Sequence, residues 1–165
     1  MAKLLMGKEV SDRIKDEMKI QVENLKKEGI NPGLAVILVG EDPASKVYVS
    51  NKKKACEYIG INSFEYKLPE TTTEKELIDL INKLNNDNSV SGILCQLPVP
   101  KHINEEAIIN AIDPKKDVDA FHPVNVGKIM TGNYDFVPCT PAGVMELIKE
   151  SGIDVCGKEC VVVGR

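Results

Sequence analysis

Several features are missing from the 165-residue sequence, and each absence excludes a class of protein. No apolar run approaches the roughly 20 residues needed to cross a bilayer. The apolar patch between Lys3 and Lys8 is too short for a signal peptide. There is no tryptophan, internal repeat or low-complexity tract. The net charge of −4, with both signs interspersed, gives no indication of nucleic-acid binding.

The cysteines do not form the patterns of a secreted or zinc-binding protein. They are five in number, which is odd, and they are scattered among the expected strands and helices. This usage is typical of reduced thiols in a cytoplasmic protein. Together with the two histidines they show no spacing typical of a zinc site, so we expect no bound metal.

Apolar runs that alternate with amphipathic segments predict an α/β fold. Strands are expected at residues 33–40, 62–68, 90–96 and 160–164, and the first of these is apolar between two glycines, as in a buried parallel strand. Periodicity and capping residues predict helices at residues 10–28, 42–60, 73–84, 104–112 and 140–152. Strands alternating with helices indicate right-handed crossovers and a three-layer domain, with a mostly parallel sheet flanked by helices.

The helix expected at residues 42–60 carries Lys52 on its apolar side. Such a lysine either extends its ammonium to water along apolar surface, or faces a cleft in which desolvation lowers its pKa. Tyr48 lies one turn earlier, so both side chains can meet one ligand. At about 100° per residue, the arc around Lys52 comprises Ala44, Tyr48, Ala55, Cys56 and Ile59, whereas Lys46, Lys53 and Lys54 point elsewhere.

Polar residues follow two expected strands, at the edge where parallel sheets bind ligands. Gln96 ends an apolar strand that Pro98 and Pro100 interrupt. Its amide either satisfies the backbone of a turn, or hydrogen-bonds a ligand or orients Lys52. Asp117 and Asp119 alternate around Val118 and would share a face of an extended segment. An isolated pair of this kind is typical of a charged surface loop, and it supplies too few oxygen ligands for a hard cation.

Four motifs resemble the bifunctional methylenetetrahydrofolate dehydrogenase/methenyltetrahydrofolate cyclohydrolase family. The resemblance covers the whole chain in order. Ala120 stands where the family usually has glycine after Asp-Val-Asp, so the loop needs a φ angle that alanine tolerates. The motifs are Tyr48-Val-Ser-Asn-Lys52 after Val-Gly-Glu-Asp-Pro-Ala-Ser, Leu84-Asn-Asn-Asp87 running into Val90-Ser-Gly-Ile-Leu-Cys-Gln96-Leu-Pro-Val-Pro100, Lys116-Asp-Val-Asp-Ala-Phe-His-Pro-Val-Asn-Val-Gly-Lys128, and Pro138-Cys-Thr-Pro-Ala-Gly143.

The resemblance assigns a role to each candidate residue. It implies that Lys52 is the catalytic lysine, whose state Gln96 helps to set, and that Asp119 binds the aminopyrimidine edge of the pterin. Tyr48 would lie against the folate ring as the fourth catalytic residue. The implied substrate contacts are Tyr48, Val49, Ser50, Asn51, Lys52, Cys95, Gln96, Leu97 and Asp119.

The family implies two reactions in one cleft. NADP first oxidises methylenetetrahydrofolate to the methenyl cation, and water then opens that cation to formyltetrahydrofolate. An amine with a lowered pKa could move the protons of the second reaction near neutral pH. This is one-carbon metabolism, which serves purine, methionine and histidine biosynthesis. The family also implies a homodimer. The cysteine usage indicates a cytoplasmic protein, and the charge and the lack of long apolar runs indicate neither nucleic acid nor membrane among its partners.

The predicted domain boundary lies near the end of the chain. Residues 1–139 are expected to form the folate-binding catalytic domain, and residues 140–165 a hinge helix with the first strand of a truncated Rossmann-type domain. Gly164 and Arg165 would begin its phosphate loop and are the expected NADP contacts. We therefore expect a fragment that binds folate weakly and does not oxidise it.

Two other interpretations of the sequence remain open. One is a non-catalytic small-ligand-binding or regulatory α/β module, which would use Gln96 and Asp119 only for binding. The other is a metal-dependent enzyme built on Asp117, Asp119 and the histidines. A folate titration and a metal analysis would distinguish the three interpretations.

Overall fold

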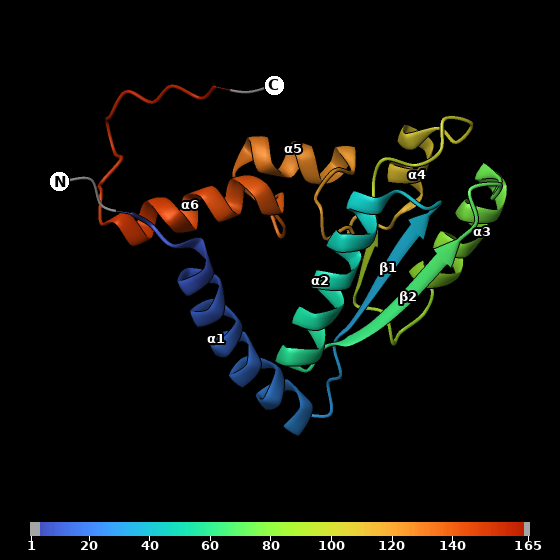
Figure 1. The fold of residues 1–165 in the computed structure, drawn as a ribbon, viewed down its shortest axis with the longest axis horizontal. Coiled ribbons are helices and arrows are strands. Elements are labelled where there is room, and N and C mark those ends of the chain that lie inside the picture. Colours follow the sequence, from blue (N-terminus) through green and yellow to red (C-terminus); the bar gives the residue numbers. More distant parts are fainter. Residues whose placement is uncertain (1–3, 164–165) are drawn as a thin grey trace.

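The computed structural model describes residues 4–163, which form an α/β fold (Figure 1). The three strands make a parallel sheet in the order β2-β1-β3. The predicted fold class, a parallel sheet flanked by helices, is therefore confirmed. In chain order the elements are α1 (Gly7–Lys27), β1 (Gly33–Val39), α2 (Pro43–Ile59), β2 (Asn62–Leu68), α3 (Glu74–Asn85), β3 (Gly92–Cys95), α4 (Glu105–Ala111), α5 (Pro123–Thr131) and α6 (Cys139–Ser151).

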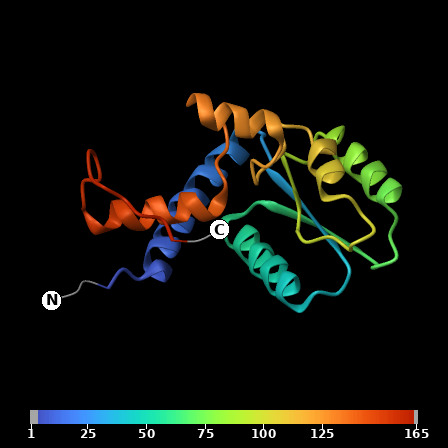
Figure 2. The same ribbon diagram turned by 90° about the horizontal axis from the view of Figure 1, so that it is seen from above.

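The central strand β1 is buried on both faces because helices cover the sheet on either side (Figure 2). Successive side chains of a strand point to opposite faces. Ile37 and its neighbours at alternate positions pack against α3, β3 and α4. Val36 and Leu38 pack on the other face with Val49 of α2 and Leu94. The sheet therefore holds two separate apolar clusters, one under α2 and one under α3 and α4.

Helices α1 and α6 lie beside this three-layer unit (Figure 1). Helix α1 packs against α2, where Tyr58 hydrogen-bonds Asp16 and the Lys19 ammonium lies 5.3 Å from the centre of the Tyr58 ring. Helix α6 has no buried residue and is joined to α1 by an ion pair of 2.9 Å between Arg13 and Glu150. None of the helices within residues 4–163 has both the length and the apolar character needed to cross a membrane.

The start and stop signals of the predicted helices are present in the structure. Asp42 caps α2 by accepting a 2.7 Å hydrogen bond from Ser45 N–H, and Gly60 ends the helix at φ 87°. Thr73 and Glu76 form the capping box predicted for α3. These local side-chain bonds explain why the bounds of both helices followed directly from the sequence.

Three predictions about the second half of the chain differ from the structure. Helix α5 was not predicted, although Pro123 in its first turn and Gly132 at φ 76° are the usual signals. Thr140 was expected to cap α6 but lies inside its first turn, after Pro138. Residues 160–163 are exposed and form no strand, because no other strand in the described part of the chain pairs with them. Gly164 and Arg165 lie outside the described residues.

Candidate functional site

Lys52 and Gln96 meet at the carboxyl edge of the sheet. Lys52 Nζ donates a 3.0 Å hydrogen bond to Gln96 Oε1, and Gln96 Nε2 donates a 2.9 Å bond to Leu97 O. The second bond fixes the amide so that its oxygen faces the lysine. Gln96 follows β3 immediately and Lys52 lies on α2, so the two come from neighbouring elements at the edge where parallel sheets bind ligands.

Asp119 is the third polar residue of this region. Burial raises the pKa of its carboxyl above the ordinary value, the positive charge of Lys52 opposes that rise, and the negative charge of Asp117 adds to it. The charges of Lys52 on α2 and of Asp117 on the loop after α4 thus act in opposite directions on this carboxyl. We refer to Tyr48, Lys52, Gln96 and Asp119 as the Lys52 site.

The apolar arc predicted for α2 is rotated relative to the observed buried face. Tyr48 is 62% exposed and Ala44 is exposed as well. Lys52 lies at the border of the buried face and is partly buried. The exposed ring of Tyr48 is therefore available to a ligand, one helical turn before Lys52. The residues of α2 that face the core are Ser45, Val49, Cys56 and Ile59.

The predicted substrate contacts fall into distinct environments. Ser50 and Asn51 are exposed beside Lys52, whereas Val49 is only 3% exposed and packs in the core. The side chain of Val49 therefore serves the packing of α2. The side chain of Cys95 lies in the cluster under α3 and α4, on the face of the sheet opposite to α2 and Lys52. Gln96 bonds Lys52 on the other face, because successive side chains of a strand point to opposite faces.

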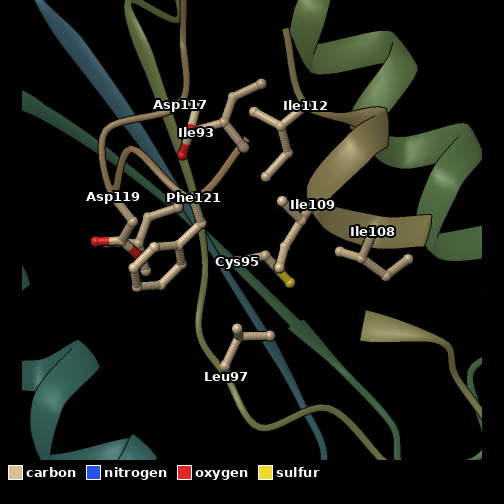
Figure 3. Close-up of a pocket in the computed structure, with 10 residues that line it drawn as sticks. Ile93, Cys95, Leu97, Ile108, Ile109, Ile112, Asp117, Asp119 and Phe121 are labelled. Atoms are coloured by element: carbon tan, nitrogen blue, oxygen red, sulfur yellow. The ribbon is translucent and has the colours of Figure 1, made fainter. Parts of the chain in front are cut away.

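A narrow apolar pocket lies behind Asp119, between the end of β3, α4 and the loop that follows α4 (Figure 3). Asp119 and Phe121 lie on one side of it, and Ile109 lies on the other. Burial raises the pKa of Cys95 to about 12, so this thiol remains neutral at physiological pH. Asp119 lines this pocket, whereas Lys52 and Gln96 do not.

The loop that carries Asp119 is anchored by residues to which the sequence had given no role. Asn85 donates to Ala111 O at 2.8 Å and accepts from Asp113 N–H at 2.9 Å. Lys116 Nζ donates to the carbonyls of Leu84 and Asp87, which close the end of α3. The Leu84–Asp87 motif and the motif around Lys116 therefore form one anchored unit, although they lie far apart in the sequence.

Ala120 adopts the left-handed backbone conformation, with φ 56°, and its side chain is fully buried. Among the residues other than glycine in the described part of the chain, it alone has a positive φ. An alanine in this region costs about 1–2 kcal/mol relative to the right-handed conformation. The geometry at position 120 therefore favours glycine, which would avoid this cost.

Both histidines have structural partners. His102 Nε2 lies 2.8 Å from Thr72 O, and His122 Nδ1 accepts a bond from Val124 N–H at the start of α5. Residues 4–163 contain no group of three or more His, Cys, Asp or Glu side chains arranged to hold a metal ion. This geometry gives the metal-dependent interpretation no candidate ligand set in the described residues.

Comparisons with known proteins agree on the relatives of this chain. The family described as "Tetrahydrofolate dehydrogenase/cyclohydrolase, catalytic domain" matches residues 5–119. The bifunctional protein FolD of Acetivibrio thermocellus is 74% identical over 164 residues, which are 99% of this chain and 58% of that protein. This chain thus spans somewhat more than half the length of that relative.

Solved structures show the same similarity. The bifunctional FolD methylenetetrahydrofolate dehydrogenase/cyclohydrolase from Campylobacter jejuni has a TM-score of 0.90 and 52% identity, covering 93% of this chain and 55% of that one. The Trypanosoma brucei methylenetetrahydrofolate dehydrogenase-cyclohydrolase, solved with NADP and an inhibitor, has a TM-score of 0.90 and 37% identity over 94% of this chain and 54% of its own.

Proposed function

Because the chain belongs to the tetrahydrofolate dehydrogenase/cyclohydrolase family, we propose that its Lys52 site binds a reduced folate and moves protons during the hydrolysis of methenyltetrahydrofolate. The observation that carries this proposal is the 3.0 Å hydrogen bond from Lys52 Nζ to Gln96 Oε1. It holds an ionisable amine at the carboxyl edge of the sheet with a neutral acceptor. The amine is thereby oriented without a neighbouring negative charge that would stabilise its protonated form.

The hydrolysis needs three proton movements. Water adds to the methenyl carbon and loses one proton. One of the two carbon–nitrogen bonds then breaks as its nitrogen gains a proton and the new hydroxyl loses its proton to solvent, which leaves a neutral formyl group. In the proposed mechanism Lys52 accepts the proton from water and returns it to the leaving nitrogen. Gln96 acts on this exchange by fixing the direction in which the amine points. A positioned acid–base group is typically worth about 10²–10⁴-fold in rate.

Asp119 and Tyr48 are the proposed binding residues for the folate. A carboxylate can accept two N–H bonds at once, which suits the aminopyrimidine edge of a pterin. The exposed ring of Tyr48 offers a flat apolar surface for stacking. Leu97 and the exposed Ser50 and Asn51 are the proposed surrounding contacts.

The dehydrogenase reaction is proposed by similarity to the relatives. The structure of one of them, the Trypanosoma brucei enzyme, was solved with NADP. When bound, NADP accepts the hydride from the methylene carbon. The residues that the resemblance assigns to it, Gly164 and Arg165, lie outside the described residues. The proposed mechanism is therefore confined to the residues of the Lys52 site, whose part in this reaction is to hold the folate.

Substitution of Lys52 tests the proposal. In the intact protein, Lys52→Met should keep the fold and lower methenyltetrahydrofolate hydrolysis by about 10²–10⁴-fold. Lys54→Met is the matched control, because Lys54 is exposed on the same helix. Hydrolysis at the wild-type rate in a folded Lys52→Met protein would contradict the assignment. Saturable folate binding without turnover in the wild type would instead favour the non-catalytic binding module.

The remaining parts of the proposal concern assembly and location. We propose a cytoplasmic homodimer on the strength of the family resemblance. Light scattering coupled to gel filtration measures the mass of the assembly, and a monomeric mass at micromolar concentration would contradict the dimer. Fractionation of the source cells tests the cytoplasmic location.

A further inference from the structure

Asp117 is a buried carboxylate with an unusual set of partners. Its side chain is only 3% exposed, as is that of Asn125 on α5. Asp117 Oδ2 accepts two hydrogen bonds, one of 2.8 Å from His122 N–H and one of 3.0 Å from Asn125 Nδ2. Asn125 Nδ2 also donates to Pro114 O at 2.9 Å. These three contacts join the loop after α4 to the first turn of α5.

The charge of Asp117 is held by dipoles. None of the ion pairs formed within residues 4–163 includes Asp117. Its donors are an amide side chain and the N–H of His122, the N-cap of α5, where the helix dipole favours a negative charge. A buried carboxylate without such donors would be strongly disfavoured. The bonds to α5 therefore explain how a carboxylate can be buried at position 117, and they fix this side chain against the start of α5.

The loop is also fixed on the side of the sheet. Ile93 N–H donates to Lys116 O at 2.7 Å, and Ile93 and Asp117 pair like residues of parallel strands. Val118 packs against the apolar cluster under α2, and Ala120 N–H donates to Asp117 O at 3.3 Å. Asp119 thus lies between a residue packed on the sheet and a turn closed by Asp117.

We infer that Asp117, which contacts no reacting atom in the proposed mechanism, is a positioning residue: through its bonds to His122 N–H and Asn125 it holds Asp119 in the orientation that binds the folate. This inference rests on the proposed function, because Asp119 matters here as the folate-binding carboxylate. It assigns a role to the first aspartate of the Asp-Val-Asp motif and to Asn125, which the family resemblance had left without one.

Two substitutions at position 117 separate the hydrogen bonds from the charge. Both donors reach the same oxygen, so Asp117→Asn can keep both bonds with its single carbonyl oxygen while losing the charge. Asp117→Ala loses both bonds. We expect the folate dissociation constant to rise at least 10-fold in Asp117→Ala and to stay within about 3-fold of wild type in Asp117→Asn.

Controls distinguish positioning from a loss of folding. Asp113→Ala is the matched control, because Asp113 accepts a bond from Lys115 N–H inside the same loop. All affinities are measured at a temperature where each variant is fully folded by circular dichroism. If Asp117→Ala does not fold, Asn125→Ala removes one of the two bonds and should raise the dissociation constant about 3- to 10-fold. Wild-type affinity in a folded Asp117→Ala protein, or in a folded Asn125→Ala protein where the former does not fold, would overturn the inference.

A second readout needs no folate and separates this inference from the proposed function. Burial raises the pKa of Asp119, the charge of Lys52 on α2 lowers it, and the charge of Asp117 on the same loop raises it further, with the neutral thiol of Cys95 nearby. Carbon-13 NMR titration should therefore show a lower pKa for Asp119 in Asp117→Asn than in wild type.

In Asp117→Ala the resonances of Asp119 and Ala120 should also move, whereas Asp113→Ala should leave them in place. Absence of folate binding by the wild type would refute the proposed function, and unchanged Asp119 resonances in Asp117→Ala would refute the positioning role.

Discussion

The amine of Lys52 and the amide of Gln96 form a 3.0 Å hydrogen bond that joins α2 to the carboxyl end of β3. The acceptor is neutral, and its orientation is fixed because Gln96 Nε2 donates to Leu97 O. A neutral acceptor leaves the lysine free to exchange its proton, whereas a carboxylate in the same place would hold it. This difference makes the residue at position 96 a direct test of the chemistry.

Gln96→Glu should slow methenyltetrahydrofolate hydrolysis by about 10²-fold or more, because the new carboxylate stabilises the protonated form of Lys52. The substitution also removes the Nε2 donor that bonds Leu97 O in the wild type, and it places a carboxylate oxygen there instead. The measurement is the pH–rate profile, whose acidic limb should move to higher pH because Lys52 must lose its proton before it can act as the base. Gln21→Glu on the exposed face of α1 serves as the control. A Gln96→Glu enzyme with the wild-type rate would show that Lys52 does not transfer the proton.

Tyr48→Ala should weaken folate binding and leave stability almost unchanged. The ring is 62% exposed, so its removal opens little core. Loss of one stacked aromatic contact is worth roughly 0.5–1.5 kcal/mol, which corresponds to a rise of about 2- to 10-fold in the dissociation constant. Isothermal titration with a reduced folate measures this change.

The second tyrosine of α2 provides the control for that experiment. Tyr58 is 51% exposed and contacts Asp16 and Lys19 of α1. Tyr58→Ala should therefore lower the melting temperature without changing folate affinity. Equal effects of the two substitutions on affinity would place the folate elsewhere.

Folate binding should be lost on acidification at a higher pH than an ordinary aspartate would give. Burial raises the pKa of Asp119, and only the ionised carboxyl can accept both N–H bonds of the pterin edge. Affinity is thus full above the pKa of Asp119 and falls as the pH drops through it. Dissociation constants measured across the acidic range in which the protein stays folded define this midpoint.

Two variants check the assignment of that midpoint. Asp119→Asn should bind folate weakly and without the acidic transition. In Lys52→Met the midpoint should move to higher pH, because the charge of Lys52 lowers the pKa of Asp119 in the wild type. A transition that persists in Asp119→Asn would belong to another group.

The parts of the fold that rest on local chemistry could be predicted from the sequence. Asp42 and Gly60 bound α2 through a side-chain cap and a left-handed glycine, and the Gly33–Val39 strand is apolar because both faces are covered. That Gln96 orients Lys52 was one of the alternatives open for Gln96 in the sequence. The structure contains the hydrogen bond between them, because the parallel strand order brings the end of β3 close to α2. These features depend on a few neighbouring residues or on the general rule for parallel sheets.

The parts that depend on contacts between distant segments could not be predicted. Asp117 resembled a surface aspartate, because nothing near it in the sequence shows that Asn125 and the N-terminus of α5 would surround it. The buried face of α2 was rotated for a similar reason. Val49 faces the core and Tyr48 faces solvent, which is decided by where β1 and β3 lie against the helix rather than by helical spacing.

Gly92→Ala should impair both stability and folate binding, because Gly92 lies under the loop that carries Asp119. A Cβ atom at position 92 would lie 2.4 Å from Val118 Cγ1, well inside van der Waals contact. Val118 is branched at Cβ and stands between the two aspartates, so it can yield only by moving the loop. Overpacking of this kind typically costs about 1–3 kcal/mol in the free energy of unfolding.

The matched glycine for this test is Gly143 in α6, where an added Cβ would meet no atom within 4 Å. Gly143→Ala should raise the free energy of unfolding by roughly 0.5–1 kcal/mol, because alanine restricts the unfolded chain and favours a helix. Urea titration measures both variants, and folate titration should show a loss of affinity only for Gly92→Ala. If Gly92→Ala kept wild-type stability but lost affinity, the loop would move without cost, and Val118 would not be the contact that fixes it. Wild-type values for both properties would mean that the approach of β3 to Val118 places no constraint on Asp119.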